Sequence, residues 1–147
     1  MQMPEPALVR RLSTLADLDA DDRSRIAELC KNTRDVPRKS HITKEGDRPK
    51  YVHVMLSGWA ARYKMLRDGS RQIVDFAIPG DFCDLHVALL SEMDHGIVAL
   101  TPCSVARIGE DEIAELTSEN NRIVRAMWWS TLVDQSILRE WVLNVGR

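Results

Sequence analysis

The sequence predicts a mainly β domain of antiparallel strands, with two short helices before it and one long helix after it. Glycines recur at positions 46, 58, 69 and 80, at intervals of eleven or twelve residues, and short β-prone runs lie between them. Such spacing is typical of antiparallel strands joined by turns. Beyond residue 120 the apolar residues recur at alternating spacings of four and three, which predicts a helix.

Two short helices are expected to open the chain. Leu8, Leu12 and Leu15 recur at helical spacing, and Ile26 and Leu29 belong to a second stripe that follows aspartates at positions 19, 21 and 22. Carboxylates at a helix start accept hydrogen bonds from free N–H groups and lie at the positive end of the helix dipole. The acidic cluster therefore marks the start of the second helix.

The expected strands are Tyr51–Ser57, Trp59–Leu66, Arg71–Ile78, His95–Thr101 and Cys103–Ile108. In the second run the odd positions from Trp59 to Met65 are apolar, while Arg62 and Lys64 lie between them, so one face is expected in the core and the other in water. Tight turns are expected at positions 68–69 and 79–81. A short helix is expected over Glu110–Thr117.

Composition excludes several classes of protein. The 147 residues are 44% hydrophobic and 29% charged, as in ordinary globular domains. A net charge of −2 with dispersed basic residues indicates that this segment alone binds DNA poorly. The first eleven residues contain no apolar stretch for a signal peptide or membrane span, so a cytoplasmic location is expected. Three cysteines without CxxC spacing predict buried thiols and neither a disulfide framework nor a metal site.

The last segment carries a pattern typical of a coiled coil. Spacings of four and three connect seven positions, Val124, Trp128, Thr131, Gln135, Leu138, Val142 and Val145, and a second stripe beside them contains Ile123, Met127, Ser130, Ile137 and Trp141. A helix that is apolar on two faces cannot bury both against one small domain, so a homodimer through the first stripe is expected. The alternative is one broad core-facing stripe on a monomer.

Several short motifs lie between Ile42 and Thr101. Each motif alone is a weak indication of a family, but their order along the chain is a specific one. They are Ile42, Glu45-Gly46-Asp47, Val52 to Gly58, Leu66 to Ile73, Phe76, Pro79-Gly80-Asp81-Phe82 and Ala99-Leu100-Thr101. Together they resemble the cyclic-nucleotide-binding domain of Crp/Fnr transcription regulators. The resemblance implies a double-stranded β-helix, or β-roll of jelly-roll type, with its N-terminal helices over residues 1–120 and a dimerisation helix over 121–147. It also implies a helix-turn-helix DNA-binding domain, which would follow residue 147.

The region that holds the phosphate in cyclic-AMP-binding members departs from the family pattern. Those members carry Gly-Glu-Leu after the Pro-Gly-Asp-type turn and then Arg-Ser, where Arg pairs with the cyclic phosphate. Here the corresponding positions, and so the candidate ligand-binding residues, are Asp84, Leu85, His86, Met93, Asp94, His95 and Gly96. A phosphate meeting a carboxylate at about 4 Å is repelled by about 4 kcal/mol at an effective dielectric of about 20. Cyclic AMP is therefore not expected in the usual mode.

Other cofactors have weaker support. A branch of the family senses oxygen through an N-terminal cysteine cluster, but only Cys30 lies in that region, so an iron–sulfur site is not expected. His86 and His95 could bind an acidic effector when protonated, or a metal or haem when neutral, but a surface or hydrogen-bonded pair is the simpler interpretation. The four tryptophans could form an aromatic wall for a planar ligand, although core or interface positions are more usual.

The sequence therefore predicts the effector-sensing and dimerisation domain of a Crp/Fnr-type regulator. Its predicted partners are a second copy of itself, an unidentified small molecule and, through the domain expected after residue 147, DNA. One alternative is a module of the same fold that acts by pairing alone. The other is a cupin-type metalloenzyme, whose His-x-His and Pro-x-Gly-x-x-His motifs are missing. No catalytic or metal-binding constellation is predicted.

Overall fold

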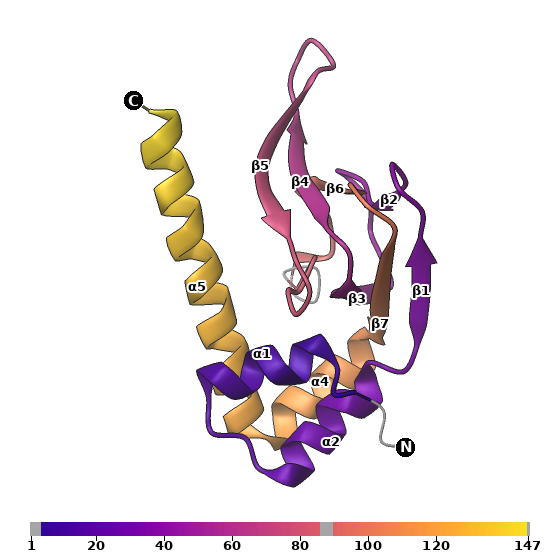
Figure 1. Ribbon diagram of the computed structural model, residues 1–147, viewed down its shortest axis with the longest axis vertical. Coiled ribbons are helices and arrows are strands. Elements are labelled where there is room, and N and C mark those ends of the chain that lie inside the picture. The colour runs from indigo at the N-terminus through magenta and orange to yellow at the C-terminus, as the bar shows by residue number, and fades with distance from the viewer. Residues whose placement is uncertain (1–3, 86–89, 147) are drawn as a thin grey trace.

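The computed structural model describes residues 4–85 and 90–146 and confirms the predicted fold class (Figure 1). The helices are α1 (Ala7–Leu15), α2 (Ala20–Leu29), α4 (Glu110–Glu119) and α5 (Asn121–Val145). The strands are β1 (Thr33–Val36), β2 (His41–Thr43), β3 (Tyr51–Ser57), β4 (Ala60–Met65), β5 (Arg71–Ala77), β6 (Gly96–Ala99) and β7 (Cys103–Gly109). No helix in these described ranges is both long and apolar enough to cross a lipid bilayer.

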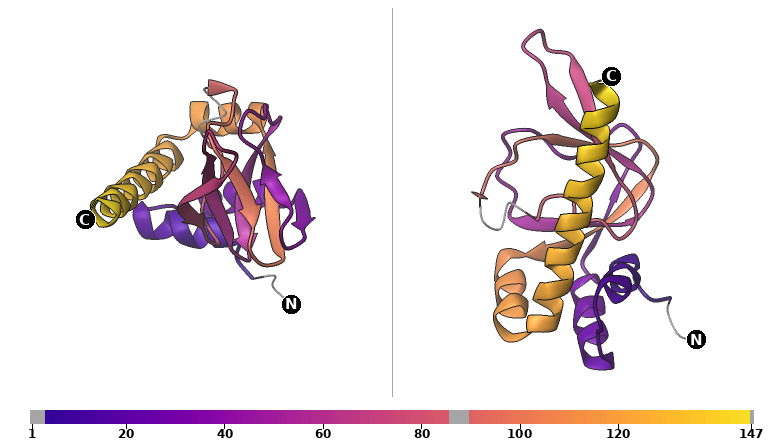
Figure 2. Two further views of the ribbon diagram at one scale, coloured as in Figure 1. Left: turned by 90° about the horizontal axis from the view of Figure 1, so that it is seen from above. Right: turned by 90° about the vertical axis from the view of Figure 1, so that its left-hand side faces the viewer.

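The strands form two antiparallel sheets that make up the roll. One sheet has the order β1-β7-β3 and the other has the order β2-β6-β4-β5. The β4–β5 hairpin extends beyond the other strands, as the views in Figures 1 and 2 show. Helices α1, α2 and α4 gather at the opposite end of the roll, and α5 rises from that group alongside the sheets. The architecture thus leaves one long helix beside one face of the roll.

Two features of the strands differ from the sequence prediction. Strands β1 and β2 were not predicted, because each is only three or four residues long and neither shows a clear alternation. The expected alternation in β4 is also wrong at its ends, where Trp59 and Met65 are exposed and Ala60 is buried. Trp59 precedes the strand, and β6 pairs with β4 only as far as Tyr63, so Met65 lies beyond this pairing and stays half exposed.

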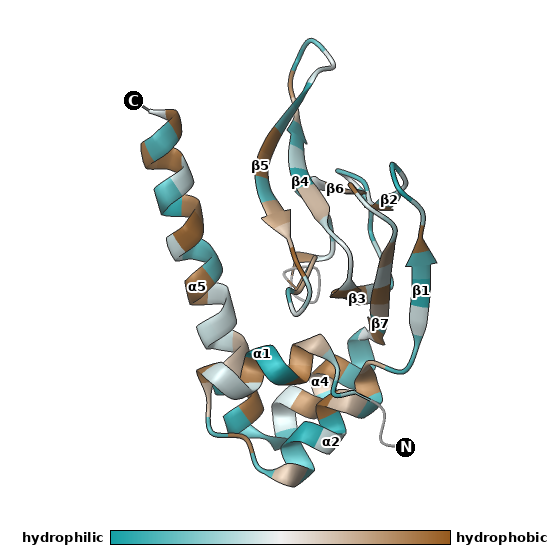
Figure 3. Ribbon diagram, viewed as in Figure 1, coloured by the Kyte–Doolittle hydropathy of each residue, from teal (hydrophilic) through white to brown (hydrophobic). Residues whose placement is uncertain are grey.

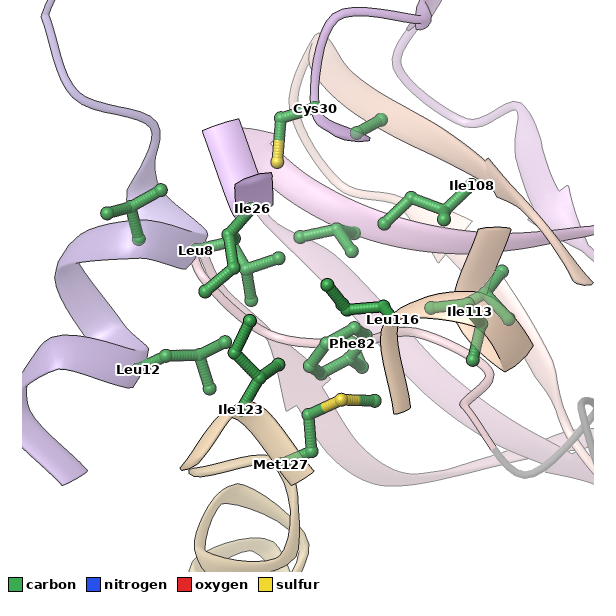
Figure 4. Close-up of a cluster of buried hydrophobic side chains, with 14 of the residues drawn as sticks. Leu8, Leu12, Ile26, Cys30, Phe82, Ile108, Ile113, Leu116, Ile123 and Met127 are labelled. Atoms are coloured by element: carbon green, nitrogen blue, oxygen red, sulfur yellow. The ribbon is translucent and has the colours of Figure 1, made fainter. Parts of the chain in front are cut away.

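The helices share a hydrophobic core with one sheet. Leu8 and Leu12 of α1, Ile26 of α2, and Ile123 and Met127 of α5 converge there, as Figure 4 shows. The predicted start of α2 is confirmed, because Asp19 is its N-cap and forms a reciprocal capping box with residue 22. This core fixes the first turns of α5 to the rest of the domain.

A second core fills the inside of the roll. It contains Met55, Met93, Ile97, Cys83 and Cys103, all nearly inaccessible to solvent. All three cysteines of the chain are free and buried, which confirms the prediction of buried thiols. Burial raises the pKa of the Cys30 thiol to about 11. These thiols therefore behave as small apolar side chains.

The C-terminal half of α5 has few contacts with its own domain. Its last buried residue is Ser130, and beyond it Trp141 packs against Phe76 of β5 with ring centroids 5.6 Å apart. Trp128 and Trp129 are at least half exposed, so these tryptophans do not belong to the core of this chain. Figure 3 shows hydrophobic residues recurring along the whole helix.

Candidate functional site

A cleft of about 900 Å³ lies between the roll and helices α4 and α5. Most of its wall is apolar. The strand and loop residues around it are Arg62, Lys64, Val74, Asp75, Phe82, Cys83, Leu85, Leu90, Asp94 and His95. The helix residues around it are Glu110, Ile113, Ala114, Thr117, Val124, Met127, Trp128, Ser130, Thr131, Asp134, Gln135 and Leu138. A ligand in this cleft would contact the roll and α5 together.

Arg62 of β4 holds the turn that follows residue 81. Its Nη1 donates to the carbonyl of Cys83 at 2.6 Å and its Nη2 donates to the carbonyl of Phe82 at 2.7 Å. Its Nε lies 3.8 Å from a carboxylate oxygen of Asp75, and Nη1 lies 3.5 Å from Nε2 of His95. The guanidinium side chain is largely buried, so its main work is to anchor the backbone of this turn.

A buried His–Asp pair fastens the same turn to β3. The backbone N–H of His53 donates to Oδ1 of Asp84 at 2.6 Å, and Nδ1 of His53 lies 2.7 Å from Oδ2. The N–H of Cys83 donates to the carbonyl of His53 at 2.8 Å. Both carboxylate oxygens of Asp84 are thus directed to β3, and the side chain has no exposed surface.

Two further basic side chains of the cleft, Lys64 and His95, also have partners. Nζ of Lys64 donates to the backbone carbonyl of Asp94 and forms an ion pair of 3.1 Å with Glu45. Nδ1 of His95 lies 2.6 Å from the Asp94 carboxylate. Neither side chain is a free cation awaiting an anionic ligand.

Asp134 of α5 is a partly buried carboxylate in the cleft wall. Asp134 forms an ion pair with Arg11 of α1 at 3.6 Å. Arg11 also forms a closer ion pair, at 3.0 Å, with Asp81. Partial burial is the main cause that raises the pKa of Asp134 to about 6, and the negative charge of Asp81 adds to the effect, while Arg62 and Arg11 oppose it. Burial likewise raises the pKa of Asp81.

The structure separates the seven candidate ligand-binding residues. Leu85, Asp94 and His95 line the cleft, whereas Asp84 and Met93 are buried behind its wall. A Cβ on Gly96 would lie 2.3 Å from the Tyr63 ring, so this glycine makes room for an aromatic side chain. His86 lies outside the described residues.

The stripe predicted as a dimer seam faces the cleft along much of its length. Its first five members, Val124, Trp128, Thr131, Gln135 and Leu138, line the cleft. Val142 and Val145 lie beyond it and are 72% and 73% exposed. The stripe is therefore only partly covered by its own chain.

Sequence reasoning missed three residues of this region. Arg62 was placed on the solvent face of its strand, and His53 and Asp134 were not among the predicted site residues. A histidine within the apolar run from Val52 to Met55 was a signal, because a buried polar side chain requires a hydrogen-bond partner. Asp134 gave no such signal, since one aspartate on a helix is usually exposed.

The fold agrees with a comparison to known families. The family model of the cyclic nucleotide-binding domain matches residues 33–120, which is more than half of the chain. The chain belongs to this family. The resemblance to Crp/Fnr domains noted in the sequence is thereby confirmed.

Two curated relatives of this cyclic nucleotide-binding domain are bacterial regulators. Transcriptional activatory protein AadR of Rhodopseudomonas palustris is 35% identical over 74 residues, which cover 50% of this chain and 30% of that protein. Nitrogen fixation regulation protein FixK of Bradyrhizobium diazoefficiens is 26% identical over 140 residues, which cover 95% of this chain and 57% of that protein. The chain thus spans less than two thirds of either relative.

Solved structures support the same fold. The structure of FixK2 from Bradyrhizobium japonicum matches with a TM-score of 0.71 and 23% identity, over 79% of this chain and 58% of that one. The catabolite activator protein of Thermus thermophilus matches with a TM-score of 0.70 and 15% identity, over 88% and 60% of the two chains. At these identities the likeness concerns the fold alone.

Proposed function

We propose that this domain is the sensory and dimerisation part of a cytoplasmic, non-catalytic transcription regulator of Crp/Fnr type. The observation that carries the proposal is the cleft, because its walls come from both the roll and α5. A molecule that fills the cleft changes the free energy of α5 relative to the roll, and such differential contact is what a sensor requires.

The attachment of α5 suits it to transmit such a change. Its N-terminal end is fixed, because Arg122 donates to the buried carboxylate of Asp22 and Ile123 lies in the helical core. Its C-terminal half touches the roll mainly through Trp141 and Phe76. A helix that is fixed at one end and sparsely held at the other can turn as a rigid lever when the cleft is filled.

Dimerisation through α5 accounts for the apolar surface that the roll leaves uncovered. Leu138, Val142 and Val145 share the predicted seam, and all three are exposed in the single chain. A second copy of α5 would cover them in a parallel pair. In the proposed regulator, the helix-turn-helix domain expected after residue 147 would then bind DNA in an orientation set by the paired helices.

The dimer is tested by sedimentation of a Val142→Glu variant. We expect this variant to be monomeric, because a charge in an apolar seam is left without water or a partner. Ser136→Glu, which introduces the same charge at an exposed position outside the seam, is the matched control and should remain dimeric. Equal dimerisation of the two variants would contradict the proposed seam.

Coupling between the cleft and the dimer is tested by filling the cleft covalently. A Thr117→Cys variant, modified with N-benzylmaleimide, places an aromatic group in the cleft from α4, away from the dimer seam, whereas the same modification of a Ser118→Cys variant places it outside the cleft. The three native thiols are buried and so react slowly. We expect the dimer dissociation constant to change severalfold for the first variant only. No difference between the two would refute the sensing role of the cleft.

A further inference from the structure

We propose that the cleft selects a ligand that joins an apolar body to a positively charged or hydrogen-bond-donating head group, with Asp134 as the counter-group. This inference rests on the proposed function, since it names the class of ligand for the same cleft. It differs from an anionic ligand such as a cyclic nucleotide in the sign of the charge that the cleft accepts.

The charges around the cleft favour a cation. The acidic residues of its described lining are Asp75, Asp94, Glu110 and Asp134, whereas Arg62 and Lys64 are its arginine and lysine. The bases are already engaged, because Arg62 donates to two backbone carbonyls and Lys64 forms an ion pair with Glu45. An anion would have to break these interactions, whereas a cation would meet an excess of negative charge.

Asp134 is a partly buried carboxylate to which none of the described side chains of the cleft donates a hydrogen bond. Its distance to Arg11 is 3.6 Å, which is beyond a hydrogen bond, and Arg11 is closer to Asp81. Asp75, also in the cleft wall, is held no closer than 3.8 Å to Arg62. Three carboxylates, Asp75, Asp81 and Asp134, therefore share two guanidinium groups. A ligand ammonium group would supply the donor that this group of side chains lacks.

The rest of the wall suits an apolar body. Val74 and Phe82 come from the roll, and Met127, Trp128 and Leu138 come from α5. Trp128 contributes an aromatic ring to the cleft wall, where it can contact a flat or cationic group. A ligand that spans these walls places its head group near Asp134, on the helix that the proposed function expects to move.

Three probes with one carbon skeleton test the charge selectivity. They are 3-phenylpropylamine, 3-phenylpropan-1-ol and 3-phenylpropanoate, and binding to the whole chain is measured by isothermal titration calorimetry near neutral pH. We expect the amine to bind at least about tenfold more tightly than the carboxylate, with the alcohol between them. Equal or tighter binding of the carboxylate would overturn the inference and leave the sensing role of the cleft intact.

Two variants with the same change of net charge locate the effect. Asp134→Asn should abolish the preference for the amine, whereas Asp111→Asn, on the exposed surface of α4 and outside the cleft, should preserve it. Circular dichroism verifies that both are folded. Loss of the preference in both variants, or in neither, would overturn the role of Asp134.

The pH profile is a second measurement that needs no variant. Asp134 faces Arg11 of α1, Arg62 of β4, Asp75 of β5 and Asp81 in the turn after β5. As the pH falls through about 6, protonation of Asp134 should weaken binding of the amine and leave binding of the alcohol unchanged.

If no probe binds the native dimer but the amine binds the Val142→Glu monomer, the partner helix occupies the cleft, and both this inference and the sensing role are refuted. If no probe binds either form, this inference alone is overturned, because the covalent filling of the cleft tests the sensing role separately.

Discussion

Replacement of Asp22 by Asn should destabilise the domain through the attachment of α5. The Asp22 carboxylate has no exposed surface and accepts from Nε of Arg122 at 2.7 Å, from Nη2 of Arg122 at 3.1 Å and from Nδ2 of Asn120. It also accepts the backbone N–H of Asp19 in the capping box. An Asn side chain keeps the shape of Asp22 but lacks its charge and one acceptor.

The magnitude follows from the pKa of the carboxyl group. The hydrogen bond from Arg122 is the largest cause that lowers the pKa of Asp22 from 3.8 to about 2. A shift of that size corresponds to between 2 and 3 kcal/mol as an order of magnitude. Because the Arg122 side chain is 56% exposed and therefore screened, we expect a loss of about 1–2 kcal/mol in the free energy of unfolding.

Urea denaturation followed by circular dichroism measures this loss, and Asp21→Asn on the same helix is the matched control. Since the pKa of Asp22 is lowered by folding, its stabilisation is present above about pH 4 and is lost as the pH falls through about 2. The stability difference between the wild-type chain and Asp22→Asn should therefore shrink over this interval. Equal stability of the Asp21 and Asp22 variants at neutral pH would refute the reasoning.

Three other substitutions have expected effects on stability. Asp134→Asn should stabilise the chain at pH 7 by about 1 kcal/mol, because burial raises the pKa of this partly exposed carboxyl group to about 6. This gain in stability should vanish below about pH 4, and a loss of stability at pH 7 would contradict the prediction. Gly58→Ala should cost more than about 2 kcal/mol in thermal melts, since its φ is +86° and a Cβ would lie 2.3 Å from the Pro102 carbonyl oxygen; Gly69→Ala, at φ +85° with open space around it, should cost about 1 kcal/mol. Asp84→Ala should cost about 2–3 kcal/mol in urea denaturation, because it leaves two buried polar groups of His53 unpaired, and an unchanged midpoint would exclude that pair as a stabilising contact.

The parts of the fold that the sequence predicted are those set by local chemistry. The aspartate at position 19 caps α2, and the glycines at positions 58 and 69 adopt the positive φ that their turns require. Long stripes of regular period were sufficient to predict α5. The short strands β1 and β2 could not be predicted, because their pairing with β7 and β6 depends on residues more than fifty positions away.

The candidate site was predicted less well than the fold. Three of the seven candidate ligand-binding residues, Leu85, Asp94 and His95, border the cleft, and their role in binding a ligand stays a prediction. Asp84 was expected to face a ligand, but its partner His53 lies on a different strand and directs the carboxylate inward. Such pairings depend on tertiary register, which a single sequence does not encode in any local pattern.

The clamp that Arg62 forms has a consequence for how this domain can change over evolution. The guanidinium holds the turn through the carbonyl oxygens of residues 82 and 83, which every amino acid possesses. Substitutions at lining positions outside the two cores, such as Val74 and Thr131, leave these acceptors in place, so the lining of the cleft can be altered without releasing the turn. Backbone carbonyl oxygens therefore anchor the turn, whereas side chains of the lining select the ligand. New ligand preferences can arise while the scaffold is conserved.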